Sequence, residues 1–420
     1  MKGGFPLEKQ TSINRRAFIW NTISGMVFAM QSAIVLIFIS HFLPRNDAGV
    51  FTIAYALANL FYTMGKYGVR NYQVTDVREK SRFSEYLRVR VYTVLGSLAV
   101  LAIYLAVQGI RGGYTGEKIA AIVAICLWKM VDAVEDVYYG MYQQKGRLDI
   151  GAKNYSVRLI ASTVVLCALI ALRMSLLAAV IVTTVFSIVL AALLIHASCS
   201  AFRESHRRVR SRAVREILRV CLPLFVGTSL SIFVGNLPKY LIDWYLDEST
   251  QAIFGYIMMP AFVISMLNQF VYQPIIRSLG ELWQNGERKR FISRVLKQYL
   301  VVLGITLVVM AGGALLGIPV LSLMYNVDLA PYKVEFLLLL LGGGIYALVT
   351  FVMVPITAMR FQKCIPYGFI GASVLSLVLG RFIVPARGIL GAAYIYLILN
   401  LLLTAYLTGC FLYRANRAGS

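Results

Sequence analysis

Long apolar runs separated by short polar segments dominate the chain. A transmembrane helix needs about 20 mostly apolar residues, and twelve runs fit or approach that length. They lie at residues 17–39, 48–69, 89–107, 119–139, 159–172, 176–199, 221–240, 252–272, 299–316, 336–354, 366–384 and 388–411. The fifth and sixth runs would be too long as one span, so we expect two helices joined by a tight turn. The pattern predicts an all-α integral membrane protein with about twelve transmembrane helices.

Basic residues divide unevenly between the two sides of such a membrane protein. If both termini are cytoplasmic, 32 of the 41 lysines and arginines fall in seven cytoplasmic segments, eight fall on the outer side, and Lys129 lies within a span. The seven segments are residues 1–16, 66–90, 145–158, 203–219, 277–297, 360–363 and 414–417. Short cytoplasmic loops are rich in Lys and Arg. We therefore predict a multi-pass membrane protein with both termini cytoplasmic.

Composition supports the membrane assignment. The 420 residues are 59% hydrophobic and 14% charged, and the mean hydropathy is +0.72, whereas soluble proteins are about 45–50% apolar and about 25% charged. The net charge of +22 then reflects topology, and no nucleic-acid partner is expected. The basic stretch 203–219 is expected to lie at the anionic cytoplasmic leaflet, with membrane lipid as its partner.

A weak internal repeat divides the chain into halves. The segment Ile39 to Phe51 matches Ile242 to Phe254 at an offset of 203 residues, and each segment joins an odd helix to an even one. We predict a six-helix lobe at 1–202, a basic linker at 203–219 and a second six-helix lobe at 220–420. Six spans return the chain to the side of the membrane on which it started, so both lobes begin on the same side. We therefore expect a parallel pseudo-two-fold repeat, with substrate held between the two lobes.

Ionisable side chains inside a membrane helix cost about 2.5–3.5 kcal/mol each and are therefore candidates for function. The fourth predicted span carries Lys129, Asp132, Glu135 and Asp136, which share one face of a helix. Four such charges cannot face lipid, so this face is expected to meet a cavity or an opposing helix. Two interpretations remain open: a self-neutralising patch, in which Lys129 pairs with Asp132 at i, i+3 and Asp132 lies at contact spacing from Asp136, or a site for ion coupling.

Further cations lie near the ends of predicted spans. Lys66 and Arg70 are four residues apart at the inner end of the second span, where they could snorkel to the interface or bind phosphate. Lys239 and Asp243 lie at the outer end of the seventh span, where they could form an exposed pair. Alternatively, Lys239 could belong to a positively charged path for the substrate, which would run from the inner mouth through Lys129 to the outer mouth. Arg381 lies at the outer end of the eleventh span. We predict Lys66, Arg70, Lys129, Lys239 and Arg381 as substrate-binding residues.

Two stretches resemble a known family. Residues 68–76 (GVRNYQVTD) with 83–87 (FSEYL) resemble the end of the second helix and the following loop in bacterial polysaccharide-biosynthesis transporters. Residues 138–147 (YYGMYQQKGR) are similar to the end of the fourth helix in the same proteins. These are the O-antigen and capsule flippases of the multidrug/oligosaccharidyl-lipid/polysaccharide exporter superfamily. The family-like positions are Arg70, Asn71, Gln73, Asp76, Gln143, Gln144 and Arg147.

The resemblance implies a location, a substrate and a direction. We expect a protein of the bacterial cytoplasmic (inner) membrane that moves an oligosaccharide on undecaprenyl pyrophosphate from the inner to the outer leaflet by alternating access. It also allows other polysaccharide-assembly proteins as partners. Twelve helices argue against the peptidoglycan-precursor branch, for which fourteen would be expected. Asp132, Glu135 and Asp136 are the candidates for ion coupling.

Two other functions stay open. A cation-coupled multidrug antiporter of the same superfamily would need a carboxylate deep in its first half, and the first span has no acidic residue. A membrane enzyme of polysaccharide polymerisation would need a large extramembrane loop. No phosphate-binding loop, metal-ligand set or nucleophile with a base is evident, so we predict a non-enzyme with no cofactor, metal or catalytic residue.

Overall fold

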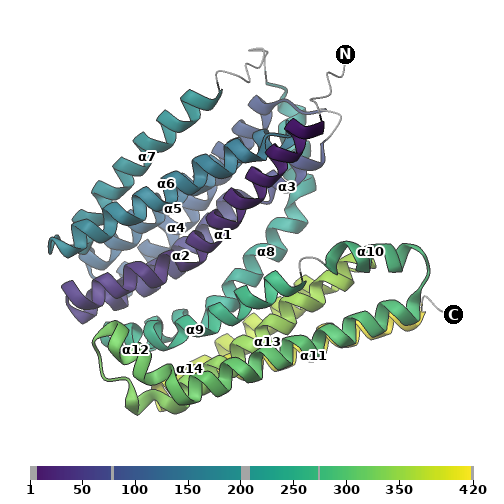
Figure 1. Ribbon diagram of the computed structural model, residues 1–420. Helices are drawn as coiled ribbons and strands as arrows, with labels where there is room; N and C mark the ends of the chain where they lie inside the picture. Colours follow the sequence, from purple (N-terminus) through teal and green to yellow (C-terminus); the bar gives the residue numbers. More distant parts are fainter. Residues whose placement is uncertain (1–6, 77–79, 200–208, 273–274, 418–420) are drawn as a thin grey trace. The chain divides into compact units, whose positions relative to one another are not determined.

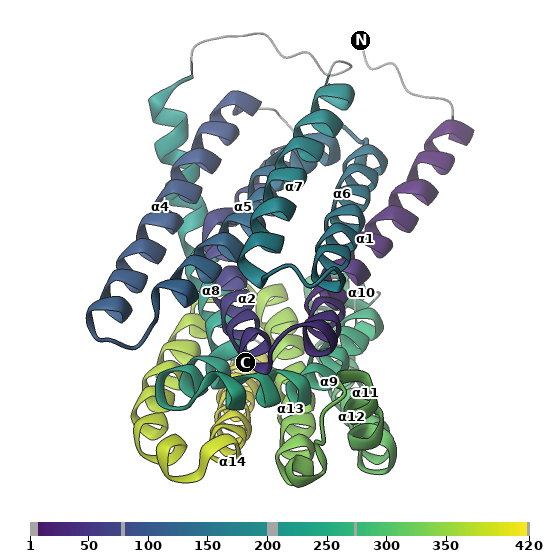
Figure 2. The ribbon, with the colours of Figure 1, turned by 90° about the vertical axis from the view of Figure 1, so that its left-hand side faces the viewer.

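The computed structural model describes residues 7–76, 80–199, 209–272 and 275–417. In these ranges the chain forms helices and short turns, with no strand. It divides into two compact units, Met1–Ser229 and Leu230–Ser420. Figures 1 and 2 draw the first unit in purple to teal and the second in green to yellow.

The first unit is a bundle of long helices. Its elements are α1 (Leu7–Phe42), α2 (Arg45–Lys66), α3 (Val69–Thr75), α4 (Phe83–Ile110), α5 (Gly116–Gln144), α6 (Leu148–Ala171), α7 (Leu176–Cys199) and the first part of α8 (Ser211–Tyr245). Helix α5 is central, since it packs against α2, α3, α4, α6 and α7. Side chains on several of its faces are therefore buried in protein.

The second unit contains the rest of α8 and the remaining elements. They are α9 (Glu248–Tyr272), α10 (Ile276–Gln284), α11 (Arg288–Gly312), a π-helical turn (Gly313–Gly317), α12 (Ile318–Tyr325), a 3-10 turn (Ala330–Tyr332), α13 (Lys333–Ala358) and α14 (Cys364–Arg417). Helix α13 packs against α9, α10, α11 and α14, and it is the central helix of this unit.

The predicted number of spans agrees with the structure. Nine helical stretches of the described chain are long and apolar enough to cross a membrane. One of them, α14, contains two predicted spans, because Gly388 (φ 57°, ψ −135°) interrupts its helical geometry. Two further predicted spans are α5 and α9, of 29 and 25 residues. At about 1.5 Å per residue, both exceed the roughly 30 Å hydrocarbon core. The all-α membrane fold is confirmed.

Two basic residues counted at the ends of predicted cytoplasmic segments lie well inside helices. Arg90 belongs to α4 and Arg158 to α6, and both side chains are fully buried. The predicted fifth span, 159–172, therefore begins too late: α6 starts at Leu148 and continues through Arg158, whose charge is paired inside the bundle. The expected break between the fifth and sixth spans is confirmed, since α6 ends at Ala171 and α7 starts at Leu176.

The predicted linker lies only partly in the described chain. Residues 200–208 are outside it, and α8 begins at Ser211. Helix α8 then runs without interruption from the first compact unit into the second. The predicted two-fold relation between the halves stays a prediction.

Candidate functional site

Helix α5 brings the candidate ionisable residues together. Its first turn is capped by Thr115, whose hydroxyl accepts a hydrogen bond from the backbone N–H of Lys118 (3.3 Å), the usual role of threonine at this position. From there, helical periodicity places the four charged residues of its central part on one side. All four are at most 6% exposed and are packed inside the bundle: Lys129, Asp132, Glu135 and Asp136.

The first three of these residues form a buried ionic cluster with α6. Lys129 Nζ lies 2.6 Å from Asp132, as the i, i+3 spacing predicted. Arg158 pairs with the other oxygen of Asp132, and its Nε donates to Glu135 (2.6 Å). Its remaining nitrogen donates to the Ser187 hydroxyl on α7 (3.0 Å). Each buried charge thus has an opposite charge beside it, as burial in a medium of low dielectric constant requires.

Lys129 is also enclosed by aromatic rings. Its ammonium nitrogen lies 4.3 Å from the centre of the Phe28 ring and 5.4 Å from that of Tyr55, distances at which a cation is attracted to a π face. Gln31 on α1 accepts a hydrogen bond from this nitrogen (3.1 Å) and another from the Tyr55 hydroxyl (3.1 Å). The lysine is therefore held in a closed cage formed by α1, α2 and α5.

Asp136 forms a second cluster nearer the end of α2. Arg90 of α4 donates to one oxygen of Asp136 (2.8 Å) and to the backbone carbonyl of Gly65 (2.8 Å). The other oxygen of Asp136 lies 3.5 Å from Lys66 and 3.6 Å from Arg70. One carboxylate is thus shared by three cations, which leaves this cluster with net positive charge.

This second cluster opens into a pocket of about 450 Å³. Its polar and charged lining comes from α2, α3, α5 and α8 and comprises Thr63, Lys66, Arg70, Asn71, Thr75, Asp136, Gln143 and Thr228. The guanidinium of Arg70 stacks 3.7 Å from the centre of the Tyr139 ring. It also donates two hydrogen bonds to Gln143 Oε1 (2.7 and 3.2 Å). Arg70 is therefore fixed in place while remaining partly exposed to the pocket.

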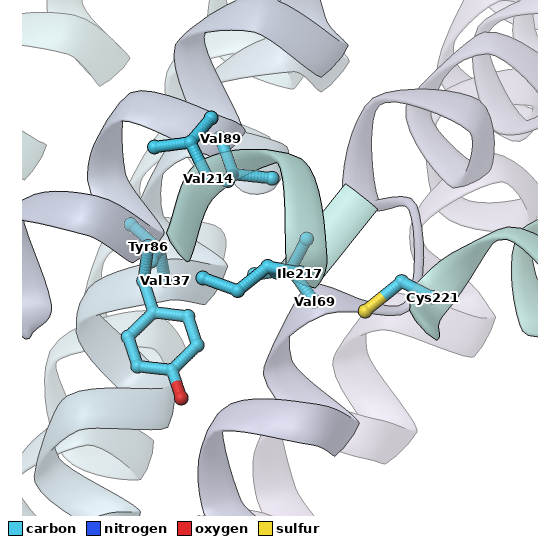
Figure 3. Close-up of a cluster of buried hydrophobic side chains, with 7 residues drawn as sticks. All are labelled: Val69, Tyr86, Val89, Val137, Val214, Ile217 and Cys221. Carbon is cyan, nitrogen blue, oxygen red and sulfur yellow. The ribbon is translucent and has the colours of Figure 1, made fainter. Parts of the chain in front are cut away.

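The first part of α8 packs against the helices that surround this pocket and contributes Thr228 to its lining. Figure 3 shows its Val214, Ile217 and Cys221 buried among side chains of α3, α4 and α5. One residue beyond α2, Tyr67 stacks on Phe225 with ring centres 4.4 Å apart. Gly68 has φ 68°, and a Cβ there would lie 2.6 Å from Leu224 Cδ2, so glycine alone suits this position.

The polar segment after α3 is held by hydrogen bonds to Asp76. Its carboxylate accepts from the backbone N–H groups of Lys80 (3.1 Å) and Ser81 (3.0 Å) and from the Tyr86 hydroxyl (2.9 Å). Burial acts to raise the pKa of Asp76, but these hydrogen bonds outweigh it and the pKa is lowered. Gln144 donates to the backbone carbonyl of Asp76 (2.9 Å). These contacts tie the end of α3 to α4 and α5.

Several family-like positions thus have identified contacts. Gln143 binds Arg70, Gln144 binds the Asp76 backbone, and Arg147 pairs with Asp149 (2.9 Å). Asn71 lines the pocket, and Gln73 is fully buried.

The eight predicted site residues do not all share one location. Lys66, Arg70 and Asp136 line the pocket, whereas Lys129, Asp132 and Glu135 form the adjoining buried cluster. Lys239 and Arg381 belong to the second unit. There Lys239 is 6% exposed, with its nitrogen 4.9 Å from the centre of the Phe262 ring, and Arg381 is exposed. A single path joining all five predicted cations stays a prediction.

Sequence reasoning missed three buried members of the site: Gln31, Arg90 and Arg158. Their sequence signals are weak, because Arg90 and Arg158 stand beside polar segments and resemble loop residues. Gln31 is a lone polar residue within an apolar run. Among the described residues, no group of three or more His, Cys, Asp or Glu side chains could hold a metal ion.

Solved structures of membrane transporters resemble this chain. A multidrug resistance MATE family transporter of the MOP superfamily, in an inward-facing conformation, matches with a TM-score of 0.69 and 14% identity, covering 96% of this chain and 98% of that one. The lipid II flippase MurJ, in an inward closed conformation, matches with a TM-score of 0.70 and 14% identity, covering 95% and 87%. At this identity the likeness establishes the fold alone.

The sequence itself identifies the family. No curated protein matches the chain significantly. The sequence model of the polysaccharide biosynthesis protein family, however, matches residues 15–279, which is more than half of the chain and includes the whole pocket and the buried ionic cluster. The chain is therefore a member of the polysaccharide biosynthesis protein family, with the fold of the MOP superfamily of transporters.

Proposed function

We propose that this protein is a flippase that moves undecaprenyl-pyrophosphate-linked oligosaccharide from the inner to the outer leaflet of the bacterial cytoplasmic membrane by alternating access. The observation that carries the proposal is the pocket at the ends of α2 and α3. It combines Lys66 and Arg70 with the neutral polar side chains of Asn71, Gln143 and Thr228. A phosphorylated sugar needs both kinds of group, cations for its phosphates and neutral donors and acceptors for its hydroxyls.

The physical problem is the desolvation of an anionic head group. A pyrophosphate without a partner cannot enter hydrocarbon, because it would lose its hydration. Fixed cations can replace the water while the polyprenyl tail stays in lipid. Arg70 suits this role, since a guanidinium binds two phosphate oxygens at once, and Gln143 and Tyr139 hold it in position.

Lys129 and the two cations of the second unit are proposed as later positions on the path. Lys129 is 1% exposed and bound to Asp132 and Gln31, so it can meet a head group only when these partners separate. Lys239 and Arg381 would serve the outer half of the transport cycle. Binding at each position has to stay weak enough for release, which several spaced cations allow.

Asp136 is the coupling carboxylate best placed to exchange protons. It lines the pocket and shares Lys66 and Arg70 with any bound phosphate, whereas Asp132 and Glu135 lie in the adjoining buried cluster. Its ionisation therefore controls how strongly those cations attract an anion. In Asp136→Asn, transport driven by a pH gradient should be lost while downhill flipping persists. Driven transport at the normal rate in a folded Asp136→Asn variant would remove Asp136 from coupling.

The decisive experiment measures flipping of a fluorescent lipid-linked oligosaccharide in vesicles containing the purified protein. We expect the wild type to flip it, Arg70→Glu to abolish flipping, and Arg70→Lys to keep part of the rate, because lysine retains the charge without the two-pronged contact. Arg88→Glu is the matched control, since Arg88 is exposed on α4 and does not line the pocket.

Two results would count against the proposal. Absence of flipping by the folded wild type in this assay would refute the assignment as a flippase for this substrate. Normal flipping by folded Arg70→Glu would refute the role of the pocket and leave the transporter assignment in place. Lys129→Gln tests the later position separately, because Lys129 does not line the pocket.

The proposed orientation places both termini in the cytoplasm, so that the pocket faces the leaflet in which the substrate is made. It rests on the uneven distribution of basic residues. A reporter fused after Arg212 should be cytoplasmic, and one fused after Asp328 should lie outside. The reverse result at either position would invert or break this topology. Membrane lipid and other polysaccharide-assembly proteins are the proposed partners.

A multidrug antiporter is the second candidate, and the likeness to the MATE transporter favours it. In this alternative, the protein would export drugs in exchange for a coupling cation. The pocket argues against it, because Lys66 and Arg70 would repel a cationic drug. The antiporter would be supported if the wild type exports ethidium from vesicles, if protons compete with ethidium, and if lipid-linked oligosaccharide has no effect on the export.

A further inference from the structure

A second pocket lies in the other unit, between α10 and the start of α11, which meet at one end of the unit (Figure 1). Its volume is about 590 Å³. Four cations and two carboxylates belong to its lining, which consists of Ser278, Glu281, Leu282, Asn285, Glu287, Lys289, Arg290, Ser293, Arg294 and Lys297. None of these residues takes part in the proposed flipping of the substrate.

The charges of this pocket are incompletely balanced. Arg290 pairs with Glu287 (2.6 Å). Lys289, Arg294 and Lys297 are exposed, and within the described chain they have no carboxylate partner. Exposed cations at the end of a membrane helix attract anions, and a lipid head group is the anion nearest to such a position.

The wall formed by α10 is anchored. Leu279 is buried, and the Trp283 ring packs against Phe291 of α11 with centres 5.2 Å apart. The guanidinium of Arg288 lies 3.4 Å from the centre of the Trp283 ring and donates to the Trp283 carbonyl (2.9 Å). The short amphipathic helix α10 is therefore fixed across the start of α11, with its polar residues Ser278, Glu281 and Asn285 toward the pocket. This arrangement is typical of a helix that lies in the membrane interface.

Helix α11 continues from the pocket as a stripe of exposed leucines. Lys289 and Ser293 share one helical face with Leu296, Leu300, Leu303 and Leu307, because the spacings alternate between three and four residues. These leucines are 42–69% exposed. From Leu296 to Leu307 the helix rises roughly 16 Å, about the thickness of one leaflet of a roughly 30 Å hydrocarbon core.

The same face of α11 thus changes from cationic to apolar over the length of one phospholipid molecule. We propose that the α10–α11 pocket binds the head group of an acidic phospholipid, whose acyl chains lie along the leucine stripe. Arg294 and Lys297 contact the phosphate. Ser293 and Asn285 are the neutral partners for a polar head group such as glycerol. This site is independent of the flippase pocket.

The test uses the full-length protein, stripped of lipid in a neutral detergent. It is titrated with phosphatidylglycerol or with phosphatidylcholine of the same chains, and bound lipid is counted by native mass spectrometry. The first phosphatidylglycerol should bind about tenfold more tightly than phosphatidylcholine. In Arg294→Gln/Lys297→Gln this preference should fall to about twofold or less.

The matched control is Arg360→Gln/Lys363→Gln. It also removes two exposed cations on the predicted cytoplasmic side, but neither lines the α10–α11 pocket, so the preference should remain. Because all four residues are exposed, both variants are expected to fold. Equal binding of the two lipids by the wild type, or an unchanged preference in Arg294→Gln/Lys297→Gln, would overturn the proposal.

A last arm distinguishes a lipid from a free anion. Glycerophosphoglycerol, which is the head group without acyl chains, and inorganic phosphate should fail to displace the bound phosphatidylglycerol even in large excess. The leucine stripe contributes nothing to their binding, since they carry no acyl chains. Efficient displacement by either compound would assign the pocket to soluble phosphate compounds and overturn its assignment to lipid.

Discussion

Helices α5 and α13 are each the fourth span of their half and the central helix of their unit, yet their contacts differ in kind. Helix α5 buries Lys129, Asp132, Glu135 and Asp136 and meets its neighbours through ion pairs. Helix α13 has no charged residue from Phe336 to Ala358. It meets its neighbours through three consecutive glycines, Gly342–Gly344.

The glycines let neighbouring helices approach α13 closely. A Cβ at Gly343 would lie 2.8 Å from the Cβ of Ala261 on α9, and one at Gly342 would lie 2.6 Å from the Tyr396 ring on α14. Small residues at helix contacts are a common solution in membranes, where hydrophobic burial between helices contributes little. The central helix of the second unit thus packs closely through glycines, whereas the central helix of the first unit carries buried charges. The candidate site is in the first unit, beside those charges.

Removing one ionic partner should produce the largest effect on stability. Arg158→Ala would leave Asp132 and Glu135 without the guanidinium that both contact. Breaking a buried pair from one side typically costs about 3–5 kcal/mol. Denaturant unfolding of the purified protein should show a loss of this size. Lys153→Ala, an exposed position on the same helix, should change little, and equal stability of the two variants would mean that the cluster does not hold the bundle together.

Filling the glycine contact should have a smaller but clear effect. A Cβ at Gly344 would overlap the Thr306 side chain of α11, so Gly344→Ala should cost about 1–3 kcal/mol, as overpacking does. Adding Thr306→Ala should restore part of the loss. Gly304→Ala on α11 is the control, because nothing lies within 4 Å of its added methyl group. If Gly344→Ala unfolds like the wild type, the close approach is not needed.

Buried hydrogen bonds should show a further, smaller difference between the two units. Gln31 accepts from Lys129 and Tyr55 and donates to Thr163 (2.8 Å), so it joins four helices. Gln31→Leu should cost about 1–2 kcal/mol, because Lys129 loses one of its two polar partners. Within the described chain, the side chain of buried Asn400 in α14 makes a hydrogen bond only inside its own helix, where it donates to the Tyr396 carbonyl (2.9 Å). Asn400→Leu should therefore cost less, and the reverse order of the two losses would contradict the comparison.

The periodicity of the chain was sufficient for much of the fold. Apolar runs of about 20 residues correctly predicted the membrane spans, since the thickness of the bilayer sets their length. Helical spacing also correctly placed the four charges of α5 on one side and paired Lys129 with Asp132. The prediction failed where a charged residue near a span boundary is buried. Arg158 was assigned to a loop, and the start of α6 at Leu148 was placed about three turns too late.

The sequence by itself therefore determined the class of the protein, its family-like motifs, and which side of α5 carries charge. Only the tertiary structure decided which partners that charge has. Arg158 reaches Asp132 across 26 residues of chain and Arg90 reaches Asp136 across 46, and local patterns carry no information about such distant contacts. The tertiary structure also closed the aromatic cage around Lys129, left Arg70 open to the pocket, and added Thr228 of α8 to the lining of that pocket. Local spacing decides the direction in which a side chain points on its helix, whereas the packing of the other helices decides whether it meets a counter-ion, an aromatic ring or open space.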